Sequence, residues 1–118
     1  MPWAVSNHDE FDPEFDALPV EVQDELLAMT ALLEVYGPRL GCPHADTLAG
    51  SRHANMKELR FKAADGVWRV AFAFDPERQA ILLVAGDKAG AAQKRFYKGL
   101  IAKADSRFTS HLRALKET

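Results

Sequence analysis

Charged side chains alternate with apolar ones in two neighbouring segments of the sequence. In MKELRFK, Glu58 and Arg60 alternate with apolar residues, and in VWRVAFAF, Arg69 precedes alternating valine, alanine and phenylalanine. Because successive side chains of a strand point to opposite faces, each segment presents its charges on one side. Two guanidinium groups can hold a phosphate through paired hydrogen bonds, and a nearby carboxylate can accept a proton. The spacing therefore indicates an anion site with a proton acceptor beside it.

The same spacing permits a second interpretation. Glu58 can pair with Arg60 and Arg69 across neighbouring strands, which would make the cluster a set of ordinary ion pairs on an exposed sheet. An anion site requires that these side chains project together from an uncovered face, the face that Ala71 and Ala73 share with Arg69. We expect that face to be open, with a cationic hollow on it.

The elements that position these residues follow from the hydrophobic spacing. We expect a short strand at 3–7, a one- or two-turn helix within 9–18, and a helix over 19–36 that ends at Gly37-Pro38. The buried stripe of this second helix is predicted as Val22, Leu26, Met29, Leu33 and Tyr36. Residues 38–55 are predicted as a loop, and 56–62, 67–74 and 80–86 as a three-stranded antiparallel meander. A helix follows from about residue 94.

Length and charge bound the class of protein. The 118 residues suit one α+β domain, 1–118, and the single cysteine, Cys42, fits a reducing compartment. Residues 1–56 carry ten acidic and two basic residues, whereas 57–118 carry seven acidic and thirteen basic. The basic half can face a polyanion, or the two halves can attract each other within the fold. With no membrane-length apolar run and no leader pattern, we expect a cytoplasmic protein without membrane contact.

The pieces KELR, WRVAFAFDP, LLVAGDK and KRFY…AD, in this order and spacing, resemble the RelE/HigB family of type II toxin–antitoxin toxins, in its phage-derived HigB-like branch. The resemblance covers almost the whole chain. It implies an α+β fold in which an N-terminal helical hairpin packs on a small antiparallel sheet, followed by a C-terminal helical segment. It also implies an endoribonuclease that cuts messenger RNA, usually on the ribosome, and that a cognate antitoxin, a HigA-like helix-turn-helix protein, holds inactive.

Residue roles follow from that resemblance. Arg69 matches the family's strand arginine that grips the scissile phosphate, with Arg60 and Lys88 as supporting cations. Glu58 and Tyr97 become acid or base candidates, and we expect the surrounding cations to lower the pKa of Tyr97 from its usual value of about 10. The remaining cations implied for RNA binding are Lys57, Lys94 and Arg95.

Other functions stay open at this point. A non-catalytic relative could act by protein binding, as a gyrase inhibitor does, and an inactive toxin domain could serve only to complex its antitoxin. Cys42, His44, Asp46 and His53 share one loop, but their spacing fits no tetrahedral metal pattern, so we expect neither a metal nor another cofactor.

Overall fold

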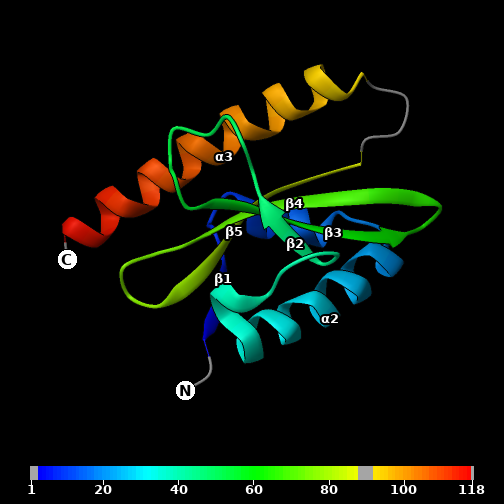
Figure 1. Cartoon of the computed structure of the whole chain (residues 1–118), viewed down its shortest axis with the longest axis horizontal. Helices are drawn as coiled ribbons and strands as arrows, with labels where there is room; N and C mark the ends of the chain where they lie inside the picture. The colour runs from blue at the N-terminus through cyan, green and yellow to red at the C-terminus, as the bar shows by residue number, and fades with distance from the viewer. Residues whose placement is uncertain (1–2, 88–91, 118) are drawn as a thin grey trace.

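The computed structural model describes residues 3–87 and 92–117 (Figure 1). Along the chain these form β1 (Ala4–Asn7), α1 (Phe11–Asp16), α2 (Val20–Tyr36), the 3-10 turn η1 (Gly37–Arg39), β2 (Ala45–Thr47), β3 (Met56–Ala63), β4 (Gly66–Phe74), β5 (Gln79–Asp87) and α3 (Gln93–Lys116). This is the predicted α+β class with its helical hairpin, sheet and C-terminal helix. Within the described ranges, no helix is both long and apolar enough to cross a membrane.

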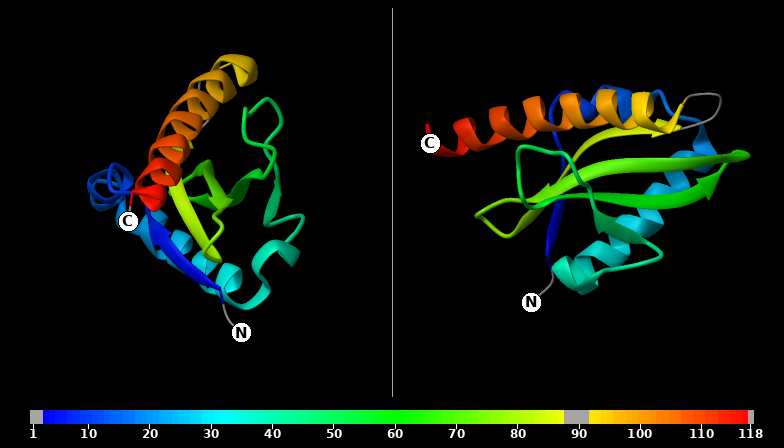
Figure 2. Two further views of the ribbon diagram at one scale, coloured as in Figure 1. Left: turned by 90° about the vertical axis from the view of Figure 1, so that its left-hand side faces the viewer. Right: turned by 45° about the horizontal axis from the view of Figure 1, so that its top comes forward.

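The sheet lies between two helical layers (Figures 1 and 2). On one face, Leu26 and Leu33 of α2 pack in a core with Phe72 of β4. On the other face, Phe108 of α3 packs in a second core with Ala71 of β4. Neighbouring residues of one strand thus serve two different cores, as the alternation of strand side chains requires.

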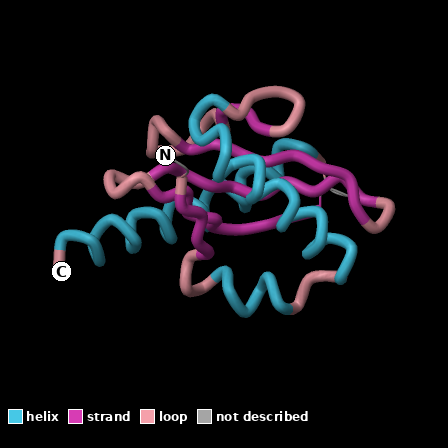
Figure 3. The backbone as a smooth tube through the Cα atoms, turned by 90° about the horizontal axis from the view of Figure 1, so that it is seen from below, coloured by secondary structure: helices cyan, strands magenta, loops and turns pink. Residues whose placement is uncertain are grey.

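The sheet is mixed, with the order β1-β5-β4-β3-β2. The predicted meander is confirmed, because β3, β4 and β5 pair antiparallel in sequence. The expectation of a purely antiparallel sheet is wrong, since β1 pairs parallel with β5. A four-residue alternating segment contains no information about the direction of its partner. The tube view in Figure 3 follows these strands from below.

The predicted loop 38–55 contains an additional strand. Ala45–Thr47 forms β2, which pairs antiparallel with β3 so that Asp46 lies opposite Glu58. Three residues are too few to show a period in a segment rich in proline, glycine and small polar residues. The pairing adds a strand at the edge next to the predicted site.

The expectation that Ala71 and Ala73 face an open side of the sheet is also wrong. Both residues are fully buried, in the core that contains Leu100 and Ala104 of α3. Their small side chains, interpreted from the sequence as room for a ligand, instead allow the helix to pack on the sheet. The part of this face around Arg60 and Glu58 does open to a cleft.

Candidate active site

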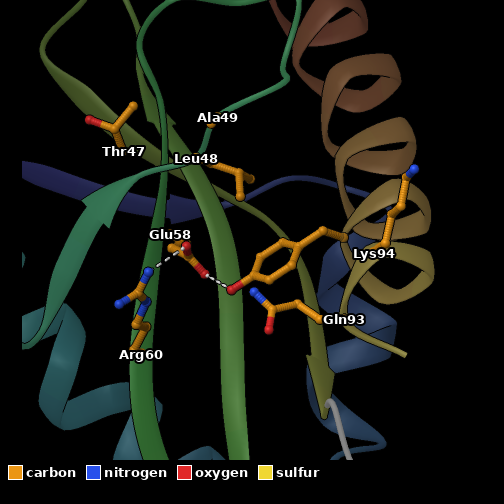
Figure 4. A pocket seen from close by; sticks show the side chains of 8 residues that line it. Thr47, Leu48, Ala49, Glu58, Arg60, Gln93 and Lys94 are labelled. Carbon is orange, nitrogen blue, oxygen red and sulfur yellow. Dashed lines mark hydrogen bonds and ion pairs between the residues drawn. The ribbon is translucent and has the colours of Figure 1, made fainter. Parts of the chain in front are cut away.

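The carboxylate of Glu58 is the centre of a cluster of three other predicted site residues. The residue is only 3% exposed. Its Oε1 accepts a hydrogen bond from the Tyr97 hydroxyl at 2.9 Å, and its Oε2 accepts one from Nη2 of Arg60 at 3.1 Å (Figure 4). Nε of Arg69 lies 3.7 Å from Oε1. The structure therefore brings Glu58, Arg60, Arg69 and Tyr97 together.

The strand register explains how the three sheet residues meet. In the β3–β4 pair, Arg60 lies directly opposite Arg69, and Glu58 lies opposite Ala71. Arg60 and Glu58 are two residues apart and so share one face of β3. The small side chain of Ala71 lies beside the carboxylate, where a larger residue would compete with the arginines for space.

Tyr97 reaches this face from the second turn of α3. The preceding Phe96 packs on β5 at Gly86, where an added Cβ would lie only 2.8 Å from the phenyl ring. Glycine at this position therefore allows the first turns of α3 to approach the sheet closely. The Arg69 guanidinium carbon lies 5.6 Å from the centroid of the Tyr97 ring, within the range of a cation–π contact.

Several guanidinium nitrogens at this site are buried without a hydrogen-bond acceptor. Within the described part of the chain, these are Nε of Arg60 and both Nε and Nη1 of Arg69. The Arg69 side chain is 15% exposed and that of Arg60 is 40% exposed. Buried donors are seldom left unpaired, because each costs desolvation free energy. Arg69 is not among the residues that line the cleft, so an anion would pair with its donors only after displacing the side chains that cover them.

A cleft of about 560 Å³ adjoins the cluster. Glu58, Arg60 and Tyr97 line it together with Lys94 of α3. The remaining walls come from Gln93 and from residues 47–49, which leave β2 (Figure 4). Its volume falls within the roughly 300–1,000 Å³ of small-molecule sites, so it can accommodate a nucleotide-sized group.

The environment raises the pKa of Tyr97, which corrects the expectation of a lowered value. Burial of the phenol is the main cause, and the hydrogen bond to Glu58 adds to it. The nearby charge of Arg69 acts in the opposite direction but is the smaller effect. The hydrogen bond to Glu58 also raises the pKa of Arg60. At neutral pH the site therefore contains a protonated phenol beside permanently charged guanidinium groups.

The remaining predicted residues are distributed differently. Lys94 lines the cleft, whereas Arg95 is exposed on α3 and is not among the cleft residues. Lys57 shares strand parity with Leu59, which packs in the α2-side core, so Lys57 lies on the face opposite Glu58. Lys88 lies outside the described residues.

Sequence reasoning missed the contribution of β2 to the site. Asp46 lies opposite Glu58 in the sheet, and its Oδ2 is 3.6 Å from Nη2 of Arg60. Thr47 and Leu48 form part of the cleft wall. The eight residues 48–55 separate β2 from β3, so no short hairpin turn marks this pairing in the sequence. A three-residue strand also shows no periodic pattern, so the sequence alone does not specify β2.

The cluster suits chemistry at a phosphate ester. Arg69 and Arg60 can bind phosphate oxygens and stabilise negative charge that develops on them. Glu58 can accept a proton, and Tyr97 can donate one. Among residues 3–87 and 92–117, no three His, Cys, Asp or Glu side chains are grouped so that they could hold a metal ion.

The fold of this chain is similar to that of two solved RelE structures. A double arginine-to-alanine mutant of E. coli toxin RelE in the free state superposes with a TM-score of 0.62 at 13% identity, covering 87% of this chain and 97% of that chain. A chain of an archaeal RelE–RelB complex from Pyrococcus horikoshii OT3 gives 0.53 at 20% identity, covering 77% and 100%. At these identities the likeness concerns the fold alone.

Two relatives from Mycobacterium tuberculosis (strain ATCC 25618 / H37Rv) are much more similar in sequence. "Putative toxin HigB2" is 45% identical over 87% of this chain. The match covers only 51% of that relative, so this chain spans about half of the relative's length. "Putative toxin HigB3" is 47% identical over 79% of each chain. Residues 13–109 also match the family described as phage-derived protein Gp49-like. The chain therefore belongs to the Gp49-like family, which is of the HigB/RelE type.

Proposed function

We propose that this protein is the toxin of a toxin–antitoxin pair and an endoribonuclease that cuts messenger RNA, on the ribosome, by attack of a ribose 2′-hydroxyl. The observation that carries the proposal is the buried Glu58 carboxylate held by Arg60, Arg69 and Tyr97 beside an open cleft. The HigB names of the relatives support the toxin role. Messenger RNA and the ribosome follow from the resemblance to the RelE/HigB family.

The reaction needs no group beyond those at the site. The scissile phosphate enters the cleft, binds the guanidinium groups of Arg60 and Arg69, and separates the Tyr97 hydroxyl from the Glu58 carboxylate, which leaves Glu58 free to accept a proton. Glu58 takes the proton of the 2′-hydroxyl as its oxygen attacks phosphorus, and the bond from phosphorus to the 5′-oxygen breaks. Tyr97 protonates the departing oxygen. The products are a 2′,3′-cyclic phosphate and a 5′-hydroxyl end.

The arginines beside Glu58 favour cleavage without a metal ion over cleavage that uses a bound divalent cation. Two guanidinium groups lie within ion-pair distance of Glu58, so a divalent cation at this carboxylate would meet two like charges at close range. Arg69 and Arg60 supply the charge stabilisation that a metal ion provides in other nucleases. We therefore expect no divalent cation to take part in the chemical step.

The partner in this proposal is an antitoxin, and the N-terminal hairpin supports a protein partner. Residues 3–38 contain nine acidic side chains and neither lysine nor arginine. On α2, Val20, Leu27, Val35 and Tyr36 are 51–70% exposed. Exposed apolar residues in a field of one charge are typical of a surface that another protein covers. A partner segment with apolar residues flanked by lysine or arginine would complement it, and a HigA-like helix-turn-helix protein remains our expected partner.

The test is induced expression in a bacterium, with sequencing of transcript ends. Growth arrest with new internal RNA ends is the expected result, and Glu58→Gln, which keeps the side-chain shape and one acceptor oxygen but is a far weaker base, should abolish both. Arrest with intact transcripts and DNA damage signalling would indicate a gyrase inhibitor instead. If expression causes no growth arrest and produces no new RNA ends, the toxin proposal is wrong.

A further inference from the structure

The outer face of α3 has exposed charges of one sign only. The helix contains seven lysine and arginine residues and a single acidic residue, Asp105. Six of the seven cations are exposed, namely Lys94, Arg95, Lys98, Lys103, Arg113 and Lys116. The seventh, Arg107, is buried and paired with Glu14, and Asp105 is buried as well. The solvent-facing side of the helix is therefore cationic from the cleft to the C-terminal end.

A second hollow, of about 390 Å³, lies against this face. Arg52, from the loop between β2 and β3, and Arg113 of α3 line it with three hydroxyl side chains of the helix, Ser106, Thr109 and Ser110. Asp105 also contributes to the lining. Guanidinium and hydroxyl groups are among the side-chain groups that bind phosphate oxygens.

The carboxylate of Asp105 is occupied by the loop that brings Arg52 to the helix. It accepts hydrogen bonds from the Ser51 hydroxyl and, at 3.1 Å, from the backbone N–H of Arg52. His53 and Thr109 share a further hydrogen bond of 2.9 Å. The Arg52 side chain itself is 77% exposed, with Nε 4.0 Å from Asp105. Asp105 thus fixes the loop and offsets one charge, while two guanidinium groups face the hollow.

The loop and the helix connect this hollow to the cleft. Leu48 and Ala49 line the cleft, and Arg52 of the same loop lines the hollow. On α3, Tyr97 lines the cleft and Thr109 the hollow. Twelve residues of helix span about 18 Å, and a stacked strand covers this distance with about five nucleotides at roughly 3.4 Å each. Figure 1 shows the loop lying beside the middle of α3.

We propose that the hollow between Arg52 and Arg113 binds a backbone phosphate of the RNA strand, about five nucleotides from the one that reacts in the cleft. This inference rests on the proposed function, since it takes the ligand of the cleft to be RNA. Contacts to phosphate carry no sequence information, so the hollow extends the footprint on the strand and fixes its direction without reading bases. Lys98 is exposed and lies four residues from both Lys94 of the cleft and Ala102 of the hollow, so helical spacing places it on the same side of α3 between the two sites.

Binding of 2′-O-methyl RNA, which lacks the attacking hydroxyl, tests this directly by fluorescence anisotropy. Oligonucleotides of four and twelve nucleotides are compared over a range of salt concentrations. The Arg52→Ala/Arg113→Ala variant should bind the dodecamer on the order of tenfold more weakly at low salt. The slope of its log affinity against log salt should become shallower by about 0.7, the change expected when one phosphate of a single strand is no longer neutralised. Binding of the tetramer should not change.

The matched control is Arg39→Ala/Lys62→Ala, which removes two exposed cations from outside α3 and the loop. It should leave the dodecamer slope as in the wild type. An unchanged slope in the Arg52/Arg113 variant, or an equal weakening for tetramer and dodecamer, would refute the distal site alone. If the wild-type protein binds neither oligonucleotide, the RNA proposal for the cleft fails, and the distal site with it.

Discussion

At the scale of single residues, the central feature is the Glu58 carboxylate, which accepts hydrogen bonds from Tyr97 and Arg60 and lies within ion-pair distance of Arg69. Glu58 satisfies the ion-pair interpretation of the sequence, because it pairs with both Arg60 and Arg69. These ion pairs leave several buried nitrogens of the two arginines without a hydrogen-bond acceptor. The two interpretations are therefore compatible: the ion pairs hold the side chains of the site in place, and an anion can replace the carboxylate as the acceptor.

Tyr97 gives a prediction that separates proton donation from packing. Tyr97→Phe retains the ring beside Arg69 and removes only the hydroxyl, so the cleavage rate should fall about 10²- to 10⁴-fold while the fold is kept. Because the pKa of Tyr97 is raised, wild-type activity should show no loss from phenol ionisation between pH 7 and 9. Single-turnover rates across pH provide the measurement. A wild-type rate in the variant would exclude Tyr97 as the acid.

At the scale of elements, Arg107 fastens α3 to the rest of the molecule. Its Nη1 donates to the backbone carbonyl of Leu83 at 2.7 Å and to Glu14 of α1 at 2.8 Å. Leu83 is the extra residue of a β-bulge in β5, since Val84 pairs with Ala71 and Leu82 with Phe72. The bulge carbonyl that the ladder leaves free is thus an acceptor for the helix that carries Tyr97.

Glu14→Gln tests this attachment. Loss of the ion pair should lower the free energy of unfolding by about 1 to 2 kcal/mol at pH 7, at the low end for a charged hydrogen bond because Glu14 is 40% exposed. Arg107 lowers the pKa of Glu14 below its ordinary 4.5, so this stabilisation is present above pH 4.5 and is lost as the pH falls through the folded-state value. Urea unfolding at pH 7 and pH 3 measures both. If Glu14→Gln lowers the free energy of unfolding equally at pH 7 and pH 3, the ion pair does not provide the attachment. The same conclusion holds if Glu25→Gln, a change at an exposed carboxylate of α2, lowers the free energy of unfolding by a similar amount.

The sequence predicted those elements in which the hydrophobic pattern repeats several times. Phe96, Leu100, Ala104 and Phe108 repeat often enough to define α3, and α2 was found for the same reason. Strand parity alone placed Glu58, Arg60 and Arg69 on one face. Packing was not predictable: Ala71 looks equally suited to a ligand or a helix, and nothing local links Asp46 to Arg60. The sign of the Tyr97 pKa shift depended on burial, which the sequence does not contain.

At the scale of the whole molecule, charge divides the protein into two surfaces. The hairpin α1–α2 covers one face of the sheet and is acidic, and α3 covers the other face with exposed cations (Figure 2). Tyr36, predicted in the buried stripe of α2, is 51% exposed with Leu27 and Val35. We assign the cationic side to RNA and the acidic, partly apolar side to the antitoxin, so each partner meets a surface of opposite charge.

This division predicts that the two functions can be separated by mutation. Leu27→Asp places another acid on an exposed position of α2 and should leave stability and RNA cleavage unchanged, while the antitoxin no longer relieves growth arrest. Val67→Asp, a matched change at a 41% exposed residue of β4, should leave relief intact. Growth with and without co-expressed antitoxin is the readout. If the antitoxin fully relieves the growth arrest caused by the Leu27→Asp variant, the hairpin is not part of the antitoxin interface.

The most direct test of the catalytic account is the cleavage rate of Arg69→Ala on a ribosome-bound messenger RNA, with Arg39→Ala as an exposed-cation control. Arg69 should stabilise the charge of the transition state, so its removal should lower the rate about 10²- to 10³-fold, equivalent to about 2.7 to 4 kcal/mol. The control should cleave as the wild type does. Cleavage by Arg69→Ala at the wild-type rate, in a protein that is still folded, would contradict the assignment of this cluster as the active site.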